Sequence, residues 1–490
     1  MSSKPYALGD LIEKWIDNRG KTPPLANEGI PLLEVKNLPA SGIYPITEGT
    51  KYVDQETYNS WFRAYLEPLD ILFSTVGTTA RVIMTPENRT VAIAQNVLGI
   101  RFKKEILDPW YMFYYMRGSK FQHDIKSRLI TTVQASIKRA DMVGIEVDVP
   151  PLSVQKSIVE KVYGLDRKVE LNHQINQTLE QMSQAIFKSW FVDFEPVKAK
   201  IAALEAGGSE EDALLAAMRV IAGDAQESAH AAEGAMPEAA KGDKLTRLQT
   251  EQPEQYAQLR ATAELFPSAM QESKLGEIPE GWAARDLKSS TTEIRRGISP
   301  KYTENGGIQV LKQKSIRSHK INFVLARRND SSKRKIDGRE IQIGDVLVNS
   351  TGVGTLGRLA PVRFLPEPSV TDSHVTVVRA NTRLISKAFL AGLMLSSEPF
   401  IEASGAGSTG QTELRKQVLE DIMFAMPSLE LSATYETIVS PMGQQIACLE
   451  EQLTSLARTR DSLLPKLLSG ELSVSETESG PTGSEETANV

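Results

Sequence analysis

The fold of this chain is decided by Pro150–Phe191, PPLSVQKSIVEKVYGLDRKVELNHQINQTLEQMSQAIFKSWF, together with Pro427–Gly470, PSLELSATYETIVSPMGQQIACLEEQLTSLARTRDSLLPKLLSG. In both stretches apolar residues recur every three or four positions, which is the pattern of a long helix with one apolar stripe. Two such stripes in one chain can bury each other, whereas a single stripe would need a partner protein. The sequence therefore predicts two long helices that pack together.

Both apolar stripes can be assigned residue by residue. The first is expected to contain Ile158, Val162, Leu165, Val169, Asn172, Ile175, Leu179, Met182, Ile186 and Trp190. The second is expected to contain Tyr435, Ile438, Met442, Ile446, Leu449, Leu453, Leu456, Arg460, Leu463 and Leu467. Polar members such as Asn172 and Arg460 are typical of positions that fix helix register. Gly164 and Pro441 fall at equivalent places, so we expect a short helix, a break and then a longer helix in each copy.

The two halves of the chain form a repeat. Adding 277 to a first-half position reaches its counterpart, as in Gly20/Gly297, Gly77/Gly354, Arg81/Arg358, Gln134/Gln411, Ile145/Ile422, Pro150/Pro427 and Val169/Ile446. Similar residues hold at Ile137/Leu414, Lys138/Arg415 and Arg139/Lys416. A period of this length indicates duplicated domains rather than a solenoid. The predicted order is globular unit, helix, linker, globular unit, helix.

Composition places the chain among globular proteins. Its 490 residues have room for two or three domains, and a hydrophobic content of 41% can supply their cores. No apolar run reaches about 18 residues, and MSSKPYALGD at the N-terminus lacks the layout of a signal peptide. A single cysteine, Cys448, excludes an internal disulfide framework. We therefore expect a cytoplasmic protein without a membrane partner.

The net charge of −6 is unevenly distributed. Residues 201–280 carry 15 acidic and 6 basic side chains, and residues 471–490 carry 5 acidic and no basic ones, so the rest is positive by 8. Residues 281–400 hold 20 basic against 10 acidic side chains, with dense runs at Lys312–Lys320 and Arg327–Lys335. One such run is often only a solvated face. Clustering in one domain of an acidic chain favours contact with a phosphate backbone.

The segments outside the helices predict two mixed α/β units. Residues 1–149 contain strand-like runs such as IPLLEVKNL and DILFSTVG, then the helical run WYMFYYMRGSKFQHDI, and residues 274–426 form a second such unit. We predict an α+β fold in which each unit is followed by a long helix, within residues 150–198 and 427–472. Residues 199–273 are expected to be an acidic, Ala-rich linker or insertion, with helices at Glu210–Gly223 and Pro253–Phe266 and a flexible stretch at Asp224–Gly242. Residues 473–490 are expected to be a disordered tail.

Several strings follow one another in a fixed order. PPLSVQKSI enters the first helix and FKSWFVDFEPV leaves it, FPSAMQESKLGEIPEGW opens the second half, and LLPKLLSGEL closes the second helix. DILFSTVG and DVLVNSTGVGTLGR stand at matched places in the two halves. In order and twofold repetition, over nearly the whole chain except residues 199–263 and the tail, these strings resemble the specificity subunit of type I DNA restriction-modification enzymes.

That resemblance implies two target-recognition domains, each reading one half of a bipartite, asymmetric DNA site. It implies that the helices form an antiparallel coiled coil as a spacer and dock two modification (methyltransferase) subunits for adenine-N6 methylation, with restriction (motor) subunits for cleavage. No catalytic residue, metal ligand or cofactor is expected on this chain; S-adenosylmethionine, ATP and Mg are implied for the partner subunits. A helix from Leu165 to Trp190 would span roughly 39 Å at about 1.5 Å per residue, close to the ~34–36 Å of one DNA turn.

Candidate DNA contacts lie in loops at matched positions. Direct readout uses Arg or Lys for guanine, Asn or Gln for adenine, and Ser or Thr for phosphates and bases. The first unit offers Lys36, Asn37, Thr75, Thr78, Thr79, Arg81, Gln95 and Asn96. The second offers Lys312, Lys314, Arg317, Ser350, Thr351, Arg358, Ser373 and His374. Arg81 and Arg358 are the best pair, since each follows a Gly/Thr turn; the alternative for every candidate is turn chemistry or a surface charge.

Two motifs suggest other functions. Gly352–Gly357 matches the dinucleotide pattern G-x-G-x-x-G, but LAPVRFLPEP follows in place of a helix, so a tight turn between strands is favoured. Glu34-Val35-Lys36 matches half of a metal-dependent nuclease site, but its counterpart Leu311–Gln313 lacks the acid, so a strand residue is favoured. The five histidines show no ligand spacing, and neither a Walker loop nor an NPPF- or DPPY-like methyltransferase string occurs.

Three hypotheses stay open. The first is a DNA-recognition subunit of a complex that both modifies and restricts DNA. The second is the same subunit in a methylation-only assembly without a motor subunit, which neighbouring genes would distinguish. The third is a stand-alone nuclease or nucleotide-dependent enzyme that uses Glu34 and Lys36 or Gly352–Gly357. DNA cleavage or nucleotide binding by the purified chain would favour this third hypothesis.

Overall fold

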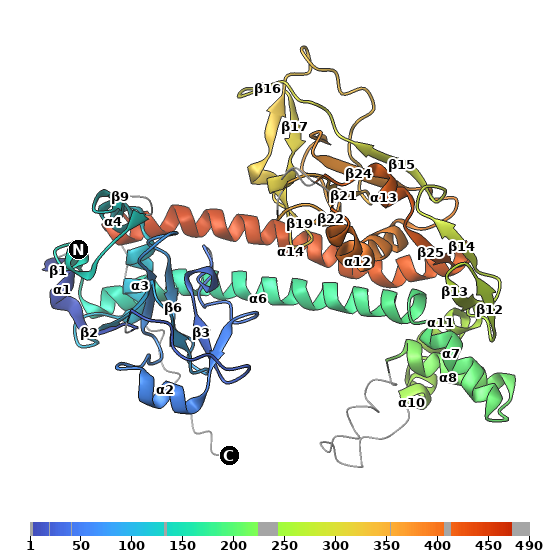
Figure 1. The fold of residues 1–490 in the computed structure, drawn as a ribbon, viewed down its shortest axis with the longest axis horizontal. Coiled ribbons are helices and arrows are strands. Elements are labelled where there is room, and N and C mark those ends of the chain that lie inside the picture. Colours follow the sequence, from blue (N-terminus) through green and yellow to red (C-terminus); the bar gives the residue numbers. More distant parts are fainter. Residues whose placement is uncertain are drawn as a thin grey trace, which may run out of the picture. The chain divides into compact units, whose positions relative to one another are not determined.

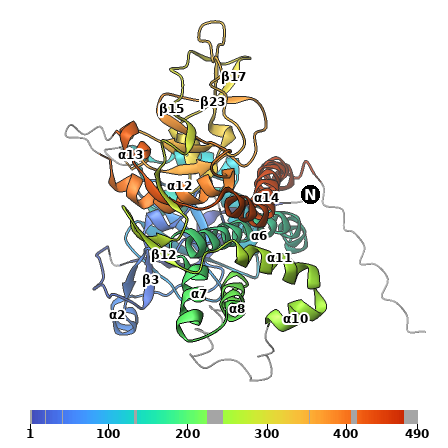
Figure 2. The ribbon, with the colours of Figure 1, turned by 90° about the vertical axis from the view of Figure 1, so that its right-hand side faces the viewer.

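The computed structural model describes residues 3–18, 20–40, 42–131, 135–223, 244–352, 354–405 and 413–472. The chain divides into two compact units, one made of Met1–Gln174 and Glu450–Val490, the other of Ile175–Leu449. Two long helices, α6 (Leu152–Phe191) and α14 (Leu429–Ser469), contribute to both units (Figure 1 and Figure 2). No helix among the described residues combines the length and the apolar character that crossing a membrane requires.

The first unit contains two small sheets and two strand pairs. The larger sheet has the order β2 (Ile12–Ile16), β8 (Val97–Phe102), β5 (Ile71–Ser74), β6 (Val82–Met84). The smaller has the order β4 (Lys51–Val53), β3 (Ile30–Leu33), β7 (Ala92–Ile93), with β3 and β7 parallel. β1 (Lys4–Ala7) pairs with β11 (Glu146–Val149), and β9 (Ile130–Thr131) with β10 (Ala135–Ser136). The short helices are α1 (Leu8–Leu11), η1 (Val35–Asn37), α2 (Gln55–Trp61), α3 (Pro109–Arg117), α4 (Ser119–Ser127) and α5 (Arg139–Met142).

Helix α3 forms the centre of the core of the first unit. It begins where the carboxylate of Asp108 accepts hydrogen bonds from the backbone N–H groups of Trp110 (2.9 Å) and Tyr111 (3.2 Å), with Pro109 in the first turn. Its side chains Tyr111, Phe113, Tyr114 and Tyr115 are buried in a core that also contains residues of β5, β6 and β8. The same core contains Ile158 and Val162 of α6 and Leu464 and Leu467 of α14. The long helices are therefore part of the hydrophobic core of this unit.

The second unit repeats this plan with additions. One sheet has the order β15 (Thr291–Arg296), β24 (Val375–Ala380), β21 (Val346–Asn349), β22 (Leu359–Pro361). The other has the order β16 (Tyr302–Thr303), β20 (Arg327–Asn329), β17 (Ile308–Leu311), β23 (Ser369–Thr371). Strand pairs are β12 (Met270–Ser273) with β13 (Gly276–Pro279), β14 (Ala283–Asp286) with β25 (Met423–Met426), and β18 (Ile316–Arg317) with β19 (Lys320–Ile321). Its other helices are η3 (Gln313–Ser315), η4 (Phe323–Leu325), α12 (Lys387–Ala403) and α13 (Lys416–Glu420).

The sheets confirm the predicted repeat. The order β2-β8-β5-β6 recurs as β15-β24-β21-β22, and β4-β3-β7 recurs as β20-β17-β23. The bridges Val76–Ser136 and Thr351–Glu413 align Val76 with Thr351, and the β21–β22 loop is two residues longer than the β5–β6 loop. The predicted pairing of Gly77 with Gly354 agrees with the backbone, since their φ values are 77° and 71°. Gln134 and Gln411 lie outside the described residues.

Both long helices are continuous, so the predicted breaks at Gly164 and Pro441 are wrong. Helix α6 has 40 residues and α14 has 41. A helical glycine costs only about 1 kcal/mol relative to alanine, which the buried contacts on either side offset. Pro441 is exposed, so its ring does not displace core side chains. Helical packing over both sites outweighs the local preference for a break.

The two helices pack against each other as predicted. In the first unit they run antiparallel, since Asp166 pairs with Arg460 (2.9 Å) and Asn172 bonds to Gln452 (3.3 Å). In the second unit Tyr435 packs on aromatic rings of α6 and donates a hydrogen bond to the carbonyl of Ser183 (3.3 Å). These contacts confirm the mixed α/β fold with paired long helices.

The stripe of α6 departs from the prediction in its second half. Ile158, Val162 and Trp190 are buried, whereas Ile175 and Met182 are 36% and 47% exposed. The buried positions are instead Asn176 (0% exposed) and Phe187 (2%). A straight α-helix has 3.6 residues per turn and drifts from a 3.5-residue repeat, so the buried face moves along the sequence. On α14, Ile446 and Leu449 are buried. The other predicted stripe positions are half-buried in α6 (Leu165, Val169, Leu179, Ile186) and in α14 (Ile438, Met442, Leu453, Leu456, Leu463).

The segment after α6 folds into helices α7 (Glu195–Glu205), α8 (Glu210–Ile221), α10 (Lys244–Glu251) and α11 (Pro253–Glu264). The predicted helices at Glu210–Gly223 and Pro253–Phe266 are therefore confirmed. Side chains of α8, α10 and α11 share a small apolar cluster that includes Met218, Leu245 and Ala263. The predicted flexible stretch Asp224–Gly242 and the tail 473–490 lie outside the described residues. The domain limits assigned from the sequence stay a prediction.

Candidate nucleic-acid interface

Three loops of the first unit meet at one end of its sheets. The turn after β5 is linked to the turn before β8, because Thr75 N–H donates to the carbonyl of Asn96 (2.9 Å). Asn96 has a φ of 69°, a left-handed conformation that asparagine tolerates. The guanidinium of Arg81 donates to the carbonyl of Leu38 and so joins the β5–β6 turn to the loop after η1. Predicted contacts from three separate stretches are thus neighbours.

The side chains predicted to contact DNA in the first unit differ in their solvent exposure. Lys36, Thr78, Gln95 and Asn96 are exposed, and Thr75 and Thr79 are half-buried. Asn37 is buried: its carbonyl oxygen accepts from Glu34 N–H (2.8 Å) and its amide donates to the Ile46 carbonyl (3.1 Å). Arg81 is held by Leu38. Asn37 therefore stabilises its loop, and we remove it from the candidate DNA contacts. Arg81 is half-buried and stays a prediction.

The second unit carries the same frame with different side chains. Ser350 N–H donates to the His374 carbonyl (2.8 Å), which repeats the link between Thr75 and Asn96. The hydroxyl of Thr351 lies 2.9 Å from Nδ1 of His374, and the amide of Gln313 donates to the Thr351 carbonyl (2.8 Å) and contacts its hydroxyl. Gln313, Thr351 and His374 therefore form a polar chain across the ends of three strands.

Gln313 was not among the predicted contacts. It lies between the predicted residues Lys312 and Lys314, at the first position of η3, where η1 has Val35. Among the predicted residues, Lys314, Arg317 and His374 are exposed, while Lys312, Thr351, Arg358 and Ser373 are half-buried. Ser350 is 1% exposed and its hydroxyl bonds to that of Thr376 (2.5 Å), so we remove it as a candidate. Unlike Arg81, the guanidinium of Arg358 makes no hydrogen bond or ion pair with the described residues.

Two buried ion pairs position the strands that lead into these turns. Asp70, just before β5, binds Arg101 of β8 (2.8 Å), and Asp345, just before β21, binds Arg379 of β24 (2.7 Å). The hydrogen bonds that both arginines donate to these carboxylates raise the pKa of each guanidinium. Each aspartate also accepts from the backbone N–H three residues earlier, Glu67 (2.8 Å) or Gln342 (2.7 Å). The sequence could have indicated these aspartates, because they are the first residues of the matched strings DILFSTVG and DVLVNSTGVGTLGR.

A charged cluster in the second unit joins α6 to the turn between β18 and β19. Glu180 of α6 pairs with Arg363 (2.8 Å), and Nε2 of His319 lies 2.6 Å from a carboxylate oxygen of Glu398 on α12. Nδ1 of His319 lies 3.9 Å from Glu180. The carboxylates of Glu180 and Glu398 raise the pKa of His319 to about 9. The imidazole is therefore charged at neutral pH and holds the β18–β19 turn against α6.

The competing motifs have structural explanations. Gly352, Gly354 and Gly357 have φ values of 102°, 71° and 85° in a turn that leads into β22, so the predicted tight turn is confirmed. The carboxylate of Glu34 pairs with Lys51 (2.7 Å) and Lys36 (2.9 Å), which lower its pKa. No group of three or more His, Cys, Asp or Glu side chains in the described part of the chain is arranged to hold a metal ion.

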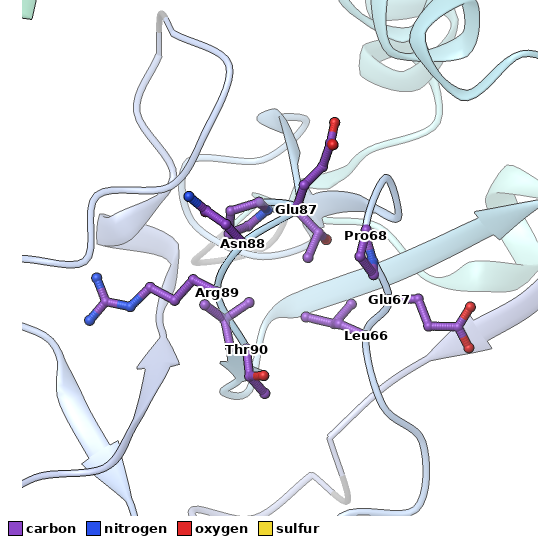
Figure 3. A pocket seen from close by; sticks show the side chains of 10 residues that line it. Leu66, Glu67, Pro68, Glu87, Asn88, Arg89 and Thr90 are labelled. Carbon is purple, nitrogen blue, oxygen red and sulfur yellow. The ribbon is translucent and has the colours of Figure 1, made fainter.

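Two hollows lie away from the predicted contacts. The one in Figure 3, of about 260 Å³, opens between Leu66–Pro68 and Thr85–Val91 of the first unit. The other, of about 240 Å³, lies in the second unit beside Glu180, Arg363 and Val439. Neither is lined by a residue predicted to contact DNA. The candidate interface is therefore the pair of loop clusters rather than a cavity.

Comparison with known proteins finds similar sequences over most of the chain. Residues 2–181 match the model of the type I restriction modification DNA specificity domain. The chain is 27% identical over 425 residues to the specificity subunit of the type I restriction enzyme HindI of Haemophilus influenzae, covering 82% of this chain and 86% of that protein. It is 21% identical over 406 residues to the MjaIX specificity subunit of Methanocaldococcus jannaschii, covering 79% of this chain and 76% of that protein.

A solved structure aligns with this chain over nearly its whole length. The S subunit of a type I restriction-modification system from M. genitalium aligns with a TM-score of 0.46 and 13% identity, over 95% of this chain and 96% of that chain. The sequence matches to the HindI and MjaIX subunits include both halves of the chain and agree with the twofold repeat. By these matches, the chain is similar to the specificity subunits of type I restriction-modification systems over most of its length.

Proposed function

We propose that this chain is the DNA-recognition subunit of a type I restriction-modification complex and reads a bipartite, asymmetric DNA site. The observation that carries the proposal is the repeated loop cluster, in which Thr75 bonds to Asn96 in one unit and Ser350 to His374 in the other. One backbone frame presents two sets of polar side chains. Such a pair suits two separate groups of base edges on one duplex.

The two loop clusters carry different side chains at the positions that would contact bases. In the first unit the bridge position is Val76 and the strand-entry position is Asn96, whereas in the second these are Thr351 and His374. Asparagine suits the adenine edge, while a threonine–histidine pair offers different donors and acceptors. The two half-sites should therefore differ in sequence, which makes the complete site asymmetric.

The long helices act as the spacer in this proposal. They determine the unread gap between the half-sites and, with the recognition domains, dock two methyltransferase subunits for adenine-N6 methylation. Restriction subunits join the same assembly for cleavage. S-adenosylmethionine belongs to the methyltransferase subunits, and ATP and Mg belong to the restriction subunits. This chain supplies sequence recognition and no catalytic group.

The proposal is tested by mapping methylated adenine across a genome. Cells carry this gene and its neighbouring methyltransferase gene, or the methyltransferase gene alone. The expected result is a gapped motif of two different blocks that vanishes without this chain. An unchanged map, with a methyltransferase shown to be active in the same cells, would refute the proposal. Cleavage of DNA bearing that motif by the complex distinguishes a restricting assembly from a methylation-only one.

The spacer is tested separately. Inserting one helical turn after Leu179 lengthens α6 by about 5.4 Å, which corresponds to one or two base pairs at about 3.4 Å each. The methylated motif should keep both half-sites and gain a longer gap. A change in the half-sites themselves would show that the helices do not act as a ruler.

A further inference from the structure

One basic surface of the second unit has no equivalent in the first. It consists of Lys312 and Lys314 at η3, Arg327 on β20, and Arg334 and Lys335 in the loop after β20; we call it the basic ribbon. All but the half-buried Lys312 are exposed. None of the five side chains forms an ion pair with the described residues. These residues lie on β20 or in the segments that follow β17 and β20, two neighbouring strands of one sheet (Figure 1).

The loop of the basic ribbon is fixed before any ligand arrives. Asn329, 0% exposed, donates to the Arg334 carbonyl (2.8 Å) and accepts from Lys301 N–H (2.9 Å). Asp330 accepts from the hydroxyl (2.6 Å) and N–H (3.0 Å) of Ser332, and these bonds with the Lys333 ion pair lower the pKa of Asp330 to about 2. The backbone that leads to Arg334 is thus held by hydrogen bonds within its own turn.

Arg327 is oriented by stacking rather than by a carboxylate. Its guanidinium carbon lies 3.8 Å from the centre of the Tyr302 ring, a cation–π contact at the edge strand β16. The stack holds the guanidinium flat and leaves its N–H groups without acceptors among the described residues. A planar fork of N–H donors matches the oxygens of a phosphate.

The first unit neutralises the same positions. By register, Lys51 opposite Leu32 is equivalent to Arg327 opposite Val310. Lys51 is paired with Glu34 (2.7 Å), and the residue in the place of Glu34 before η3 is Lys312. After β4 the first unit continues into α2, which contains Glu56 and no lysine or arginine. The repeat therefore has a neutralised surface in one copy and a positive one in the other.

We propose that the basic ribbon contacts DNA phosphates beside the second half-site, so that the second unit supplies most of the salt-dependent affinity. This rests on the proposed function and goes beyond it. The loop clusters contact bases in both units, whereas only the second unit contacts the DNA phosphates through a basic ribbon. Phosphate contacts fix register and carry no base information. Loss of the ribbon should therefore weaken binding without changing the methylated motif.

The test uses the full chain assembled with its methyltransferase subunit. A triple variant, Arg327→Ala, Arg334→Ala and Lys335→Ala, is compared with wild type by measuring Kd for a duplex carrying the motif across a series of salt concentrations. Each lost phosphate contact reduces the slope of log K against log salt by about 0.9. The slope should therefore fall by roughly 2 to 3 for three contacts, while the genomic motif stays the same.

Two matched controls accompany the triple variant. Arg327→Lys, Arg334→Lys and Lys335→Arg keep the charge and should keep the slope. Lys156→Ala, Lys161→Ala and Lys168→Ala remove three exposed charges from α6 and should change the slope by much less. Equal losses from both alanine triples would overturn the proposal by pointing to net charge.

Two further outcomes separate the hypotheses. An unchanged slope in the ribbon triple would also overturn the proposal, and loss of methyltransferase assembly at unchanged slope would assign the ribbon to a protein partner. Absence of any bipartite motif in wild-type cells would instead refute the proposed function. The two failures are therefore distinguishable.

Discussion

Removing the carboxylate of Asp166 should destabilise the first unit by about 3 kcal/mol. Asp166 on α6 and Arg460 on α14 pair at 2.9 Å, with side chains 4% and 16% exposed. Breaking a buried pair from one side costs about 3–5 kcal/mol, because the remaining charge stays desolvated. In the variant Arg460 still pairs with the exposed Asp461 at 2.8 Å, so we expect a loss of stability at the lower end of this range. Burial lowers the pKa of Arg117, and the negative charge of Asp166 opposes that shift. Asp166→Ala therefore also removes a charge that stabilises the protonated guanidinium of Arg117.

The assay is amide hydrogen exchange in the part of α6 that belongs to the first unit. A loss of 3 kcal/mol corresponds to roughly 100-fold faster exchange of its slowest amides, at about 1.4 kcal/mol per factor of ten. Asp461→Ala is the matched control and should change exchange by less than about 1 kcal/mol, because that carboxylate is exposed. Double substitution at Asp166 and Arg460 should cost less than the sum of the single changes. A cost for Asp166→Ala below about 1 kcal/mol, or strict additivity, would refute this account.

Other predictions concern single positions. Two carboxylates raise the pKa of His319 from 6.5 to about 9, so its contribution to stability is complete below pH 6.5 and is lost as pH rises through 9; urea midpoints of wild type should fall across this window relative to His319→Gln. Gly164→Ala should stabilise α6 by about 1 kcal/mol, since nothing lies within 4 Å of the new Cβ. Gly392→Ala should destabilise by about 1–3 kcal/mol, because its Cβ would lie 2.3 Å from the Phe187 ring; thermal unfolding measures both. His374→Ala should change the base preference of the second half-site alone, and a change in the first half-site on the methylation map would contradict this.

The repeat made much of the candidate interface predictable. Matched positions such as Thr75 and Ser350 were found because a duplicated fold returns each loop to the same end of its sheet. The sequence did not distinguish side chains that face a ligand from those that stabilise a loop. Asn37 and Ser350 have suitable chemistry but are buried and bonded internally. Gln313 was missed because its contact with Thr351 spans 38 positions.

The sequence by itself determined the twofold repeat, the two long helices and the excess of basic residues in the second half. These follow from periodicity and composition, which are local or additive properties of the chain. Only the tertiary structure decided which cations are neutralised, since Lys51 meets Glu34 whereas Arg327 meets Tyr302. It also placed Asn176 rather than Ile175 on the buried face of α6. The physical reason is the same in both cases: burial and ion pairing depend on neighbours brought together by packing, and those neighbours lie far away in the sequence.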